Sequence, residues 1–349
     1  MPNTCYVRLW VVKTKRVMKY ENEIIKLYNE DCLIGLKNIK ENTIDAIITD
    51  PPYGLKFMNN KWDYQIPSVE CFSEMMRVLK PGGYMLVACA TRTQHRMAVN
   101  IEDSGFEIRD IISWIYGSGF PKNKKLPDGM GTALKPAMEL FTLARKPISE
   151  KTVLKNYTKW GVGLNIDECR IPGIKPLREN TENKEGMFGL GSRLANGFSE
   201  EGRFPSNLIH DGSSEVVDLF PKNIEGKEKF KHSASSIYKN ASKNSFYNGE
   251  SKSSYGSASR FFYCSKASKK ERNGNDHPTV KPIHLMEYLI KLISKKRQLI
   301  LDPFLGSGTT AIASYNTNRD MLGFEISEIY FKDAIIRYEF HTNQQQLLL

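Results

Sequence analysis

The stretch Asp50-Pro51-Pro52-Tyr53-Gly54 constrains this chain more than any other. It follows the apolar run Ile44 to Ile48, which is typical of a buried strand. Two consecutive prolines fix the backbone and remove two hydrogen-bond donors, so the chain here forms neither helix nor paired strand. The sequence therefore predicts a stiff, extended segment that presents the Asp50 carboxylate, the Pro51 carbonyl and the Tyr53 ring. Such a group suits a planar ligand with an exocyclic amino group; a plain proline turn after a strand is the alternative.

A second patterned stretch lies near the C-terminal end and reads Leu-Ile-Leu-Asp-Pro-Phe-Leu-Gly-Ser-Gly-Thr-Thr from Leu299 to Thr310. It predicts a strand, a glycine-rich turn and a helix that Thr309 or Thr310 caps. The helix N-terminus suits an anion such as a carboxylate. The turn lacks the Gly-Lys-Ser/Thr of a phosphate-binding loop and the third glycine of the dinucleotide fingerprint.

Together, the Asp-Pro-Pro-Tyr-Gly segment and the later Asp-Pro-Phe-x-Gly-Ser-Gly-Thr-Thr segment resemble the amino-methylating DNA methyltransferases that use S-adenosylmethionine. Their order along the chain resembles the β class of that family. The similarity covers residues 24–147 and 277–340 and leaves the middle unmatched. It implies an α/β fold with a doubly wound, Rossmann-like sheet, which in the family is mostly parallel and seven-stranded with one antiparallel strand.

The resemblance also assigns site residues. Asp50, Pro51, Pro52 and Tyr53 are the expected catalytic residues, with Asp50 and the Pro51 carbonyl accepting the hydrogens of the target amine and Tyr53 stacking on a flipped base. Asp31 is expected near the cofactor's adenine, although a helix cap is an equal alternative. Glu325 is expected at the ribose hydroxyls. Thr279 and Lys281 are expected near the methionine end. The full expected cofactor-binding set is Asp31, Cys32, Asp50, Thr279, Lys281, Asp302, Phe304, Gly306, Ser307, Gly308, Thr309, Thr310 and Glu325.

The activity that the resemblance implies is methyl transfer to adenine N6, because members with Asp before Pro-Pro mostly act on adenine. Cytosine N4 is the alternative, since Ser is commoner there. A catalytically silent DNA-binding protein is an alternative of another class. Relatives that methylate protein glutamine or RNA more often carry Asn in place of Asp50. No cysteine follows a proline as in ring-carbon methylases, and no metal is expected.

The chain's net charge of +11 favours a polyanionic partner. Between Lys222 and Asn273 ten Lys and two Arg face four Glu, a net +8, with aromatic residues interleaved. This stretch predicts a DNA-contacting region, with a mobile part at 225–257, although a solvated linker has a similar composition. The expected organisation is an extension (1–22), a catalytic half (23–147), a target-recognition insertion (148–275), a cofactor half (276–340) and a tail (341–349).

Two loops beside the predicted site carry basic and apolar residues. The first, Leu55 to Pro67, either touches DNA or packs as a lid. The second, Gly117 to Lys135, is long and rich in Gly, Pro and Lys. A loop of this length inside a compact domain is usually functional, so contact with DNA or with the cofactor is expected rather than a passive linker. It separates the predicted strands Phe106–Tyr116 and Ala137–Ala144.

The remaining features concern compartment and partners. The six cysteines contain no C-x-x-C pair, so neither a zinc site nor a disulfide framework is indicated, and a cytoplasmic location is expected. No stretch has the form of a signal peptide or a membrane span. The expected partner is double-stranded DNA; the family resemblance adds a homodimer and a cognate restriction endonuclease.

Overall fold

The computed structural model of the chain describes residues 10–12, 15–55, 63–117, 119, 124–171, 175–181, 191–199, 202–220, 262–264 and 280–346. The chain divides into two compact units, of which the first comprises Met1–Arg170, Phe204–Ser213 and Phe261–Leu349 and the second comprises Ile171–Arg203 and Ser214–Arg260. Residues 56–62, the stretch 225–257 and Thr279 lie outside the described residues, so the expectations placed on them stay predictions.

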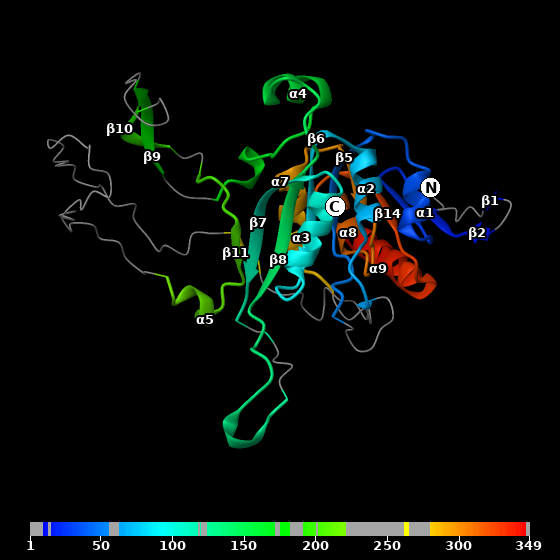
Figure 1. Ribbon diagram of the computed structural model, residues 1–349. Helices are drawn as coiled ribbons and strands as arrows, with labels where there is room; N and C mark the ends of the chain where they lie inside the picture. The colour runs from blue at the N-terminus through cyan, green and yellow to red at the C-terminus, as the bar shows by residue number, and fades with distance from the viewer. Residues whose placement is uncertain are drawn as a thin grey trace. The chain divides into compact units, whose positions relative to one another are not determined.

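In the described part of the first unit, ten strands form one sheet in the order β12-β11-β7-β8-β6-β5-β13-β14-β4-β3 (Figure 1). The seven central strands form the expected doubly wound arrangement, and among them only β8 runs antiparallel to its neighbours. They are β7 (Glu107–Ile115), β8 (Met138–Arg145), β6 (Leu79–Cys89), β5 (Ile44–Thr49), β13 (Leu299–Asp302), β14 (Asp320–Phe324) and β4 (Ile25–Tyr28).

The expected count of seven strands is too small for this sheet. β3 (Lys19–Glu21) pairs antiparallel with β4, and β11 (Leu208–His210) and β12 (Phe262–Tyr263) extend the opposite edge in parallel. These edge strands are two or three residues long, too short for a hydrophobic period to be readable in the sequence.

Strands far apart in the sequence are neighbours in the centre of this sheet. Ile300 pairs with Ala46 and Leu301 pairs with Ile47, so β13 lies directly beside β5. Because the two strands are parallel, the residues that follow them emerge at the same edge of the sheet. Ligands of open α/β sheets bind at this carboxyl edge. The topology therefore brings the two patterned segments of the sequence together.

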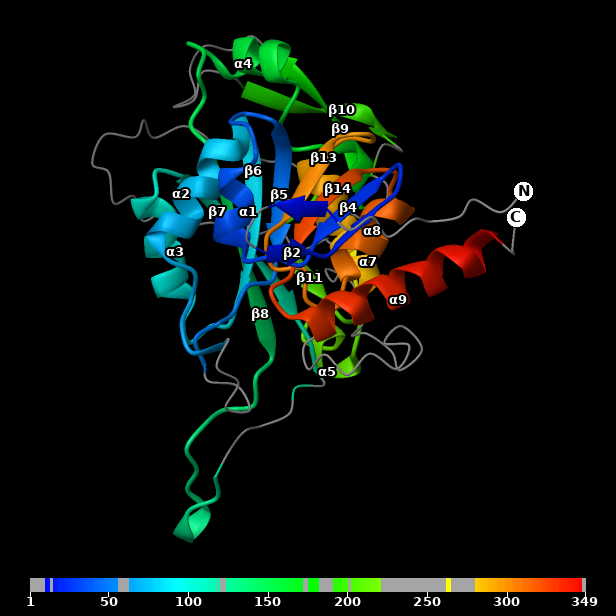
Figure 2. The same cartoon turned by 90° about the vertical axis from the view of Figure 1, so that its right-hand side faces the viewer.

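Helices cover both faces of the sheet (Figure 2). On one side, Ile44 and Ile47 of β5 pack into a core cluster with α1 (Cys32–Lys37), α2 (Val69–Val78) and α3 (Gln94–Asp103). On the other side, Ala46 and Ile48 pack with α7 (Ile283–Ile293) and with part of α8 (Thr309–Asn316). Residues of one strand thus enter two cores, which explains why apolar residues of β5 are buried on both faces of the sheet.

Three boundaries differ from those that the sequence predicts. The N-cap of α8 is Gly308 rather than a threonine, because the backbone there has a φ of 75° and a Cβ would crowd Ala334. The sequence predicts a strand over Tyr84 to Ala90, but β6 begins at Leu79, because the Lys146 carbonyl accepts the Gly82 N–H and the Lys146 N–H donates to the Gly83 carbonyl, each at 3.0 Å. The last helix, α9 (Glu328–Gln346), continues into the glutamines expected to be a loose tail.

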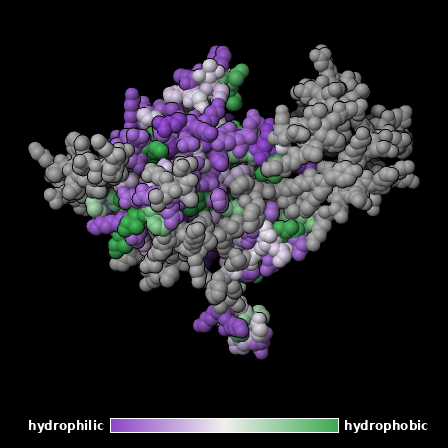
Figure 3. Space-filling model, turned by 180° about the vertical axis from the view of Figure 1, so that it is seen from behind, coloured by the Kyte–Doolittle hydropathy of each residue, from purple (hydrophilic) through white to green (hydrophobic). Residues whose placement is uncertain are grey.

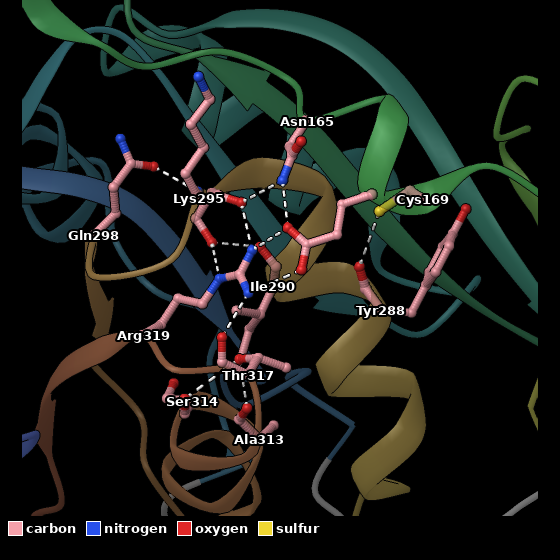
Figure 4. Close-up of polar contacts among 12 residues, drawn as sticks. Asn165, Cys169, Tyr288, Ile290, Lys295, Gln298, Ala313, Ser314, Thr317 and Arg319 are labelled. Carbon is pink, nitrogen blue, oxygen red and sulfur yellow. Dashed lines mark hydrogen bonds and ion pairs between the residues drawn. The ribbon is translucent and has the colours of Figure 1, made fainter. Parts of the chain in front are cut away.

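A buried arginine ties the segment before the second unit to the core (Figure 4). Arg319, with a fully buried side chain, precedes β14 and donates to Glu168 at 2.7 and 3.1 Å. It also donates to the carbonyl of Thr317 at 2.6 Å and that of Ser294 at 2.9 Å. The Glu168 carboxylate therefore holds its segment against the ends of α7 and α8. Although burial opposes it, the Arg319 guanidinium keeps the pKa of Glu168 below its ordinary value.

Other described elements lie outside the central sheet. The second unit contains the antiparallel pair β9 (Lys175–Thr181) and β10 (Gly191–Ser199) and the short helix α5 (Ser214–Val217). In the first unit, β1 (Trp10–Val12) pairs with β2 (Lys15–Val17), and α4 (Val153–Trp160) contacts β6. None of the described helices has the length and apolar character needed to span a bilayer.

Candidate active site

The Asp-Pro-Pro-Tyr segment emerges from β5 as an extended chain, and a buried carboxylate holds it in place. Asp63 accepts the backbone N–H of Tyr53 at 2.7 Å, of Gly54 at 3.0 Å and of Leu55 at 3.2 Å. Gly54 has a φ of 68°, which lets the chain turn back so that one carboxylate reaches all three groups. The prolines supply stiffness and Asp63 supplies the missing hydrogen-bond partners.

Four side chains from three segments converge beyond the end of β5. The Asp50 carboxylate accepts the Tyr53 hydroxyl at 2.6 Å and the Lys281 ammonium at 2.7 Å, one on each oxygen. Lys281 also lies 3.1 Å from the Glu139 carboxylate and donates to the Tyr53 hydroxyl at 3.1 Å. One buried cation is therefore shared by two carboxylates, and both oxygens of Asp50 are engaged.

The protonation states in this cluster follow from its charges. Burial alone lowers the pKa of the Lys281 ammonium, but the Asp50 and Glu139 carboxylates outweigh it and hold that pKa above its ordinary value. Burial, together with the same two charges, raises the pKa of Tyr53 well above its ordinary range. Lys281 therefore stays charged, and the Tyr53 phenol stays a hydrogen-bond donor toward Asp50.

The glycine-rich turn after β13 is held from two directions. Glu325, which follows β14, accepts the N–H of Gly306 on one oxygen and that of Ser327 on the other, each at 2.8 Å. Arg337 of α9 donates to the Ser307 carbonyl at 2.9 Å and to the Thr309 hydroxyl at 2.8 Å. The turn is thus fixed before any ligand binds. Burial raises the pKa of the Glu325 carboxyl, while its backbone donors work against that rise.

Asp302 joins the ends of the two central strands. Its carboxylate accepts the Thr49 hydroxyl of β5 at 2.7 Å and the N–H of Phe304 at 3.1 Å. The side chain is buried, which raises the pKa of Asp302 to about 6 despite these hydrogen bonds. This contact joins the end of β5, from which the Asp-Pro-Pro-Tyr segment emerges, to the end of β13, which precedes the glycine turn.

Both patterned segments line one cavity of about 380 Å³. The four expected catalytic residues line it, so the Asp-Pro-Pro-Tyr segment and the glycine turn face the same space. Of the expected cofactor-binding residues, Gly308 does not line the cavity and Thr279 lies outside the described residues. The others all do: Asp31, Cys32, Asp50, Lys281, Asp302, Phe304, Gly306, Ser307, Thr309, Thr310 and Glu325.

Asp31 caps a helix, which was one of its two expected roles, and the expected contact with the cofactor's adenine stays a prediction. Its carboxylate accepts the N–H of Leu33 at 2.8 Å as the N-cap of α1, and the residue also lines the cavity. Glu325, whose carboxylate accepts backbone N–H groups, also lines the cavity. The cavity therefore offers a helix N-terminus for a carboxylate, acidic groups for hydroxyls and amines, and the Asp50 cluster for an amino group.

Several residues of the site were not predicted from the sequence. Glu139 reads as one residue of the predicted strand 137–144, yet it lines the cavity and pairs with Lys281. Tyr116 also lines the cavity; burial and the Glu139 charge raise its pKa to about 12. Asp63 holds the Asp-Pro-Pro-Tyr segment, and Arg337 holds the glycine turn. In the sequence, such a residue can be noticed as a charge at a strand end or within an apolar helix face. That position does not indicate which residue it pairs with.

Within the described residues, no group of three or more His, Cys, Asp or Glu side chains is placed to hold a metal ion. The described cysteines are all free thiols.

Comparison with known proteins places this site in a family. The family model N6_N4_Mtase, described as DNA methylase, matches residues 44–336. Type II methyltransferase M.HindIII of Haemophilus influenzae is 25% identical over 365 residues, covering 91% of this chain and 96% of the relative. Type II methyltransferase M.HpaI of Haemophilus parainfluenzae is 25% identical over 326 residues, covering 91% and 75%.

Among solved structures, the crystal structure of the M1.HpyAVI–SAM complex is 21% identical, covering 90% of this chain and 100% of that chain, with a TM-score of 0.46. The family match spans most of the 349 residues. The chain therefore belongs to the N6/N4 DNA methylase family and is an S-adenosylmethionine-dependent DNA methyltransferase.

Proposed function

We propose that this protein methylates the exocyclic N6 of adenine at specific sites in double-stranded DNA, on a base rotated out of the duplex. The observation that carries the proposal is that Asp50 and Gly306 line one cavity. One small molecule can therefore contact the glycine turn and reach the acceptors after β5. Asp50 before the two prolines favours adenine over cytosine by resemblance to the family.

The residues present fit the methyl donor. Gly306, Ser307 and the N-terminus of α8 suit its carboxylate, Glu325 its ribose hydroxyls, and Asp31 its adenine. Thr279 and Lys281 belong to its methionine end in this proposal. When bound, S-adenosylmethionine supplies a methyl group on a positively charged sulfur, which takes back the electrons of the broken C–S bond.

The chain's own task is to make a poor nucleophile reactive. The lone pair of a base amine is delocalised into the ring. Asp50 and the Pro51 carbonyl accept its two hydrogens, which favours a pyramidal nitrogen with its lone pair turned toward the methyl group. Asp50 then accepts the departing proton, directly or through a water molecule. No cysteine nucleophile and no covalent enzyme intermediate take part.

Glu139 can take over the pairing with Lys281, which allows Asp50 to bind the target amine. In this structure both Asp50 oxygens are engaged, by Tyr53 and by Lys281, so an incoming amine must displace one of these donors. Lys281 already lies 3.1 Å from Glu139, and this second carboxylate can keep the ammonium paired when Asp50 turns to the base. We assign Glu139 as a positioning residue that acts through Lys281. Tyr53 remains the proposed stacking partner of the base.

The proposal extends to the rest of the chain. Residues 148–275, which contain the second compact unit and the basic aromatic stretch, form the target-recognition region, between the catalytic half (23–147) and the cofactor half (276–340). A homodimer and a cognate restriction endonuclease are the proposed protein partners, and the cytoplasm is the proposed location.

One experiment tests the reaction and the base together. Genomic DNA from cells that express the protein is digested to nucleosides, which are identified by mass spectrometry, and is sequenced with modification-sensitive detection. N6-methyladenine within a recurring sequence supports the proposal. Detection of N4-methylcytosine instead would identify cytosine as the target base. The absence of any modified base, together with S-adenosylmethionine failing to bind, would favour a silent DNA-binding protein.

A further inference from the structure

An arm of the first unit, described at residues 117, 119 and 124–137, projects from the site. It joins β7 to β8 and extends well beyond the ends of both strands in the two cartoon views (Figures 1 and 2). Both ends of the arm reach the cavity, because Tyr116 lines it on one side and Pro136, Met138 and Glu139 line it on the other. The arm therefore begins and ends at the place where the target base is proposed to bind.

The base of the arm is held in one arrangement. The Lys135 ammonium donates to the Gly117 carbonyl, and the Gly117 N–H donates to the Asp211 carboxylate at 2.9 Å. The two sides pass so close that a Cβ at Gly119 would overlap the carbonyl of Pro136. A glycine is thus required at this crossing, and the arm leaves the domain through a narrow, tied neck.

The tip of the arm is a closed turn that exposes apolar side chains. The N–H of Leu126 donates to the Met130 carbonyl at 2.9 Å, and the N–H of Met130 donates to Pro127 at 3.2 Å. Asp128 has a φ of 57°, which completes the tight turn. Leu126 is 43% exposed and Met130 is 65% exposed, so the turn presents an apolar pair to solvent. Figure 3 shows hydrophilic and paler, more apolar atoms side by side at this projection.

The charge of the arm indicates its partner. Four lysines stand against one aspartate in residues 117–137, a net +3. Lysines neutralise phosphates, and apolar side chains of DNA-bending proteins enter between base steps as wedges. A base rotated into an enzyme pocket leaves a gap in its stack, and opening that stack costs free energy. An exposed apolar turn near lysines, on an arm whose two ends line the cavity, has the chemistry that both tasks need.

We propose that the arm is the enzyme's DNA wedge: Leu126 and Met130 enter the stack beside the flipped base, while Lys124 and Lys125 contact phosphates. This inference rests on the proposed function, because it presupposes that the target base leaves the duplex. It adds which part of the chain opens the stack. A second copy of this chain is the other occupant that an exposed apolar turn could have, and the experiment below separates the two.

The test compares a double variant, Leu126→Ser with Met130→Ser, with the wild type and with the control Leu154→Ser. Leu154 is 74% exposed on α4, and it does not line the cavity. Single-turnover methylation is measured on two duplexes that carry the site found by sequencing methylated DNA. In one duplex the target base is paired, and in the other it faces an abasic position, so that its stack is already weakened. Sedimentation velocity gives the oligomeric state.

We expect the double variant to methylate the paired duplex about tenfold to a hundredfold more slowly, the loss that follows when a contribution to unstacking is removed. We expect it to act within about threefold of wild type on the abasic duplex, and the control to match wild type on both. Equal losses on both duplexes, or no loss on either, would overturn the wedge. A wild-type dimer that becomes monomeric in the double variant, with equal losses, would assign the tip to a contact between copies. A wild type that methylates neither duplex would instead refute the proposed function.

Discussion

Replacing Asp50 with asparagine isolates the proposed grip on the target amine. The exchange keeps the size of the side chain and removes its charge and one acceptor. In the wild type its two oxygens accept Tyr53 at 2.6 Å and Lys281 at 2.7 Å. In the variant the amide oxygen can face Lys281, and the amide NH2 can face the Tyr53 hydroxyl, which also accepts. Lys281 keeps Glu139 at 3.1 Å, so we expect unfolding free energy to fall by only about 1–2 kcal/mol.

The effect on transfer is expected to be much larger than the effect on stability. A preorganised acceptor or donor aimed at charge that develops in a transition state contributes about 3–4 kcal/mol to the barrier, which is about 10²–10³-fold in rate. The amine loses this contribution in the variant, because only the Pro51 carbonyl still accepts one of its hydrogens. The glycine turn and Glu325 are untouched, so the dissociation constant of S-adenosylmethionine should change by less than about threefold.

Single-turnover transfer of a radiolabelled methyl group, with enzyme in excess over DNA, measures the step without product release. Asp45→Asn is a matched control, because Asp45 is a buried carboxylate of β5, the strand that Asp50 follows, is paired with Lys80 at 2.5 Å, and does not line the cavity. We expect this control to transfer at close to the wild-type rate. Transfer by Asp50→Asn within about fivefold of wild type, or equal slowing of both variants, would refute the role given to Asp50.

Three further predictions concern residues that hold the site and the fold. Glu325→Ala should weaken S-adenosylmethionine binding by about 1–3 kcal/mol, or roughly 5–150-fold in dissociation constant by calorimetry, because ribose contacts and the bond to Gly306 are both lost; an unchanged constant would contradict the ribose assignment. Asp63→Asn should slow transfer more than it weakens cofactor binding, since one amide cannot accept three N–H groups; a parallel loss in both would indicate general unfolding. Arg319→Met should lower unfolding free energy by about 3 kcal/mol in denaturant titrations at pH 7. The pKa of Glu168 is lowered in the folded state, so the stability that this pair contributes is present above the ordinary carboxyl pKa and is lost as the pH falls through the lower, folded value. Wild type should therefore lose more stability on acidification below about pH 4.5 than Arg319→Met does, and an equal loss in both would show that the pair is not the source.

The features predicted correctly from the sequence are those that depend on local patterns of residues. The apolar run before Asp50 and the glycine turn around Gly306 each indicate the end of a strand. The carboxyl ends of parallel strands lie at one edge of the sheet. The pairing of β13 with β5 then brought the two segments to one cavity, as the family resemblance implied.

What the sequence could not supply are partners made by the fold. Glu139 enters the site because β8 runs antiparallel, so that its first residues lie where its neighbours end. Nothing near Glu139 in the chain indicates Lys281, which comes 142 positions later in the numbering. The same holds for Arg337 beneath the glycine turn. The cap of α8 was misassigned for a local reason, since a threonine is a good cap in general, but the close approach of α9 to Gly308 demands a residue without Cβ.

The order of the strands also sets when the enzyme can become complete during its synthesis. β4 and β5 are made early and follow one another along the chain, but in the finished sheet β13 and β14 stand between them. Until the ribosome has synthesised those two late strands, β4 and β5 each keep one edge whose backbone N–H and C=O groups are unpaired. Exposed strand edges of this kind promote aggregation. A nascent chain stopped before residue 299 should therefore depend on chaperones far more than the released protein does.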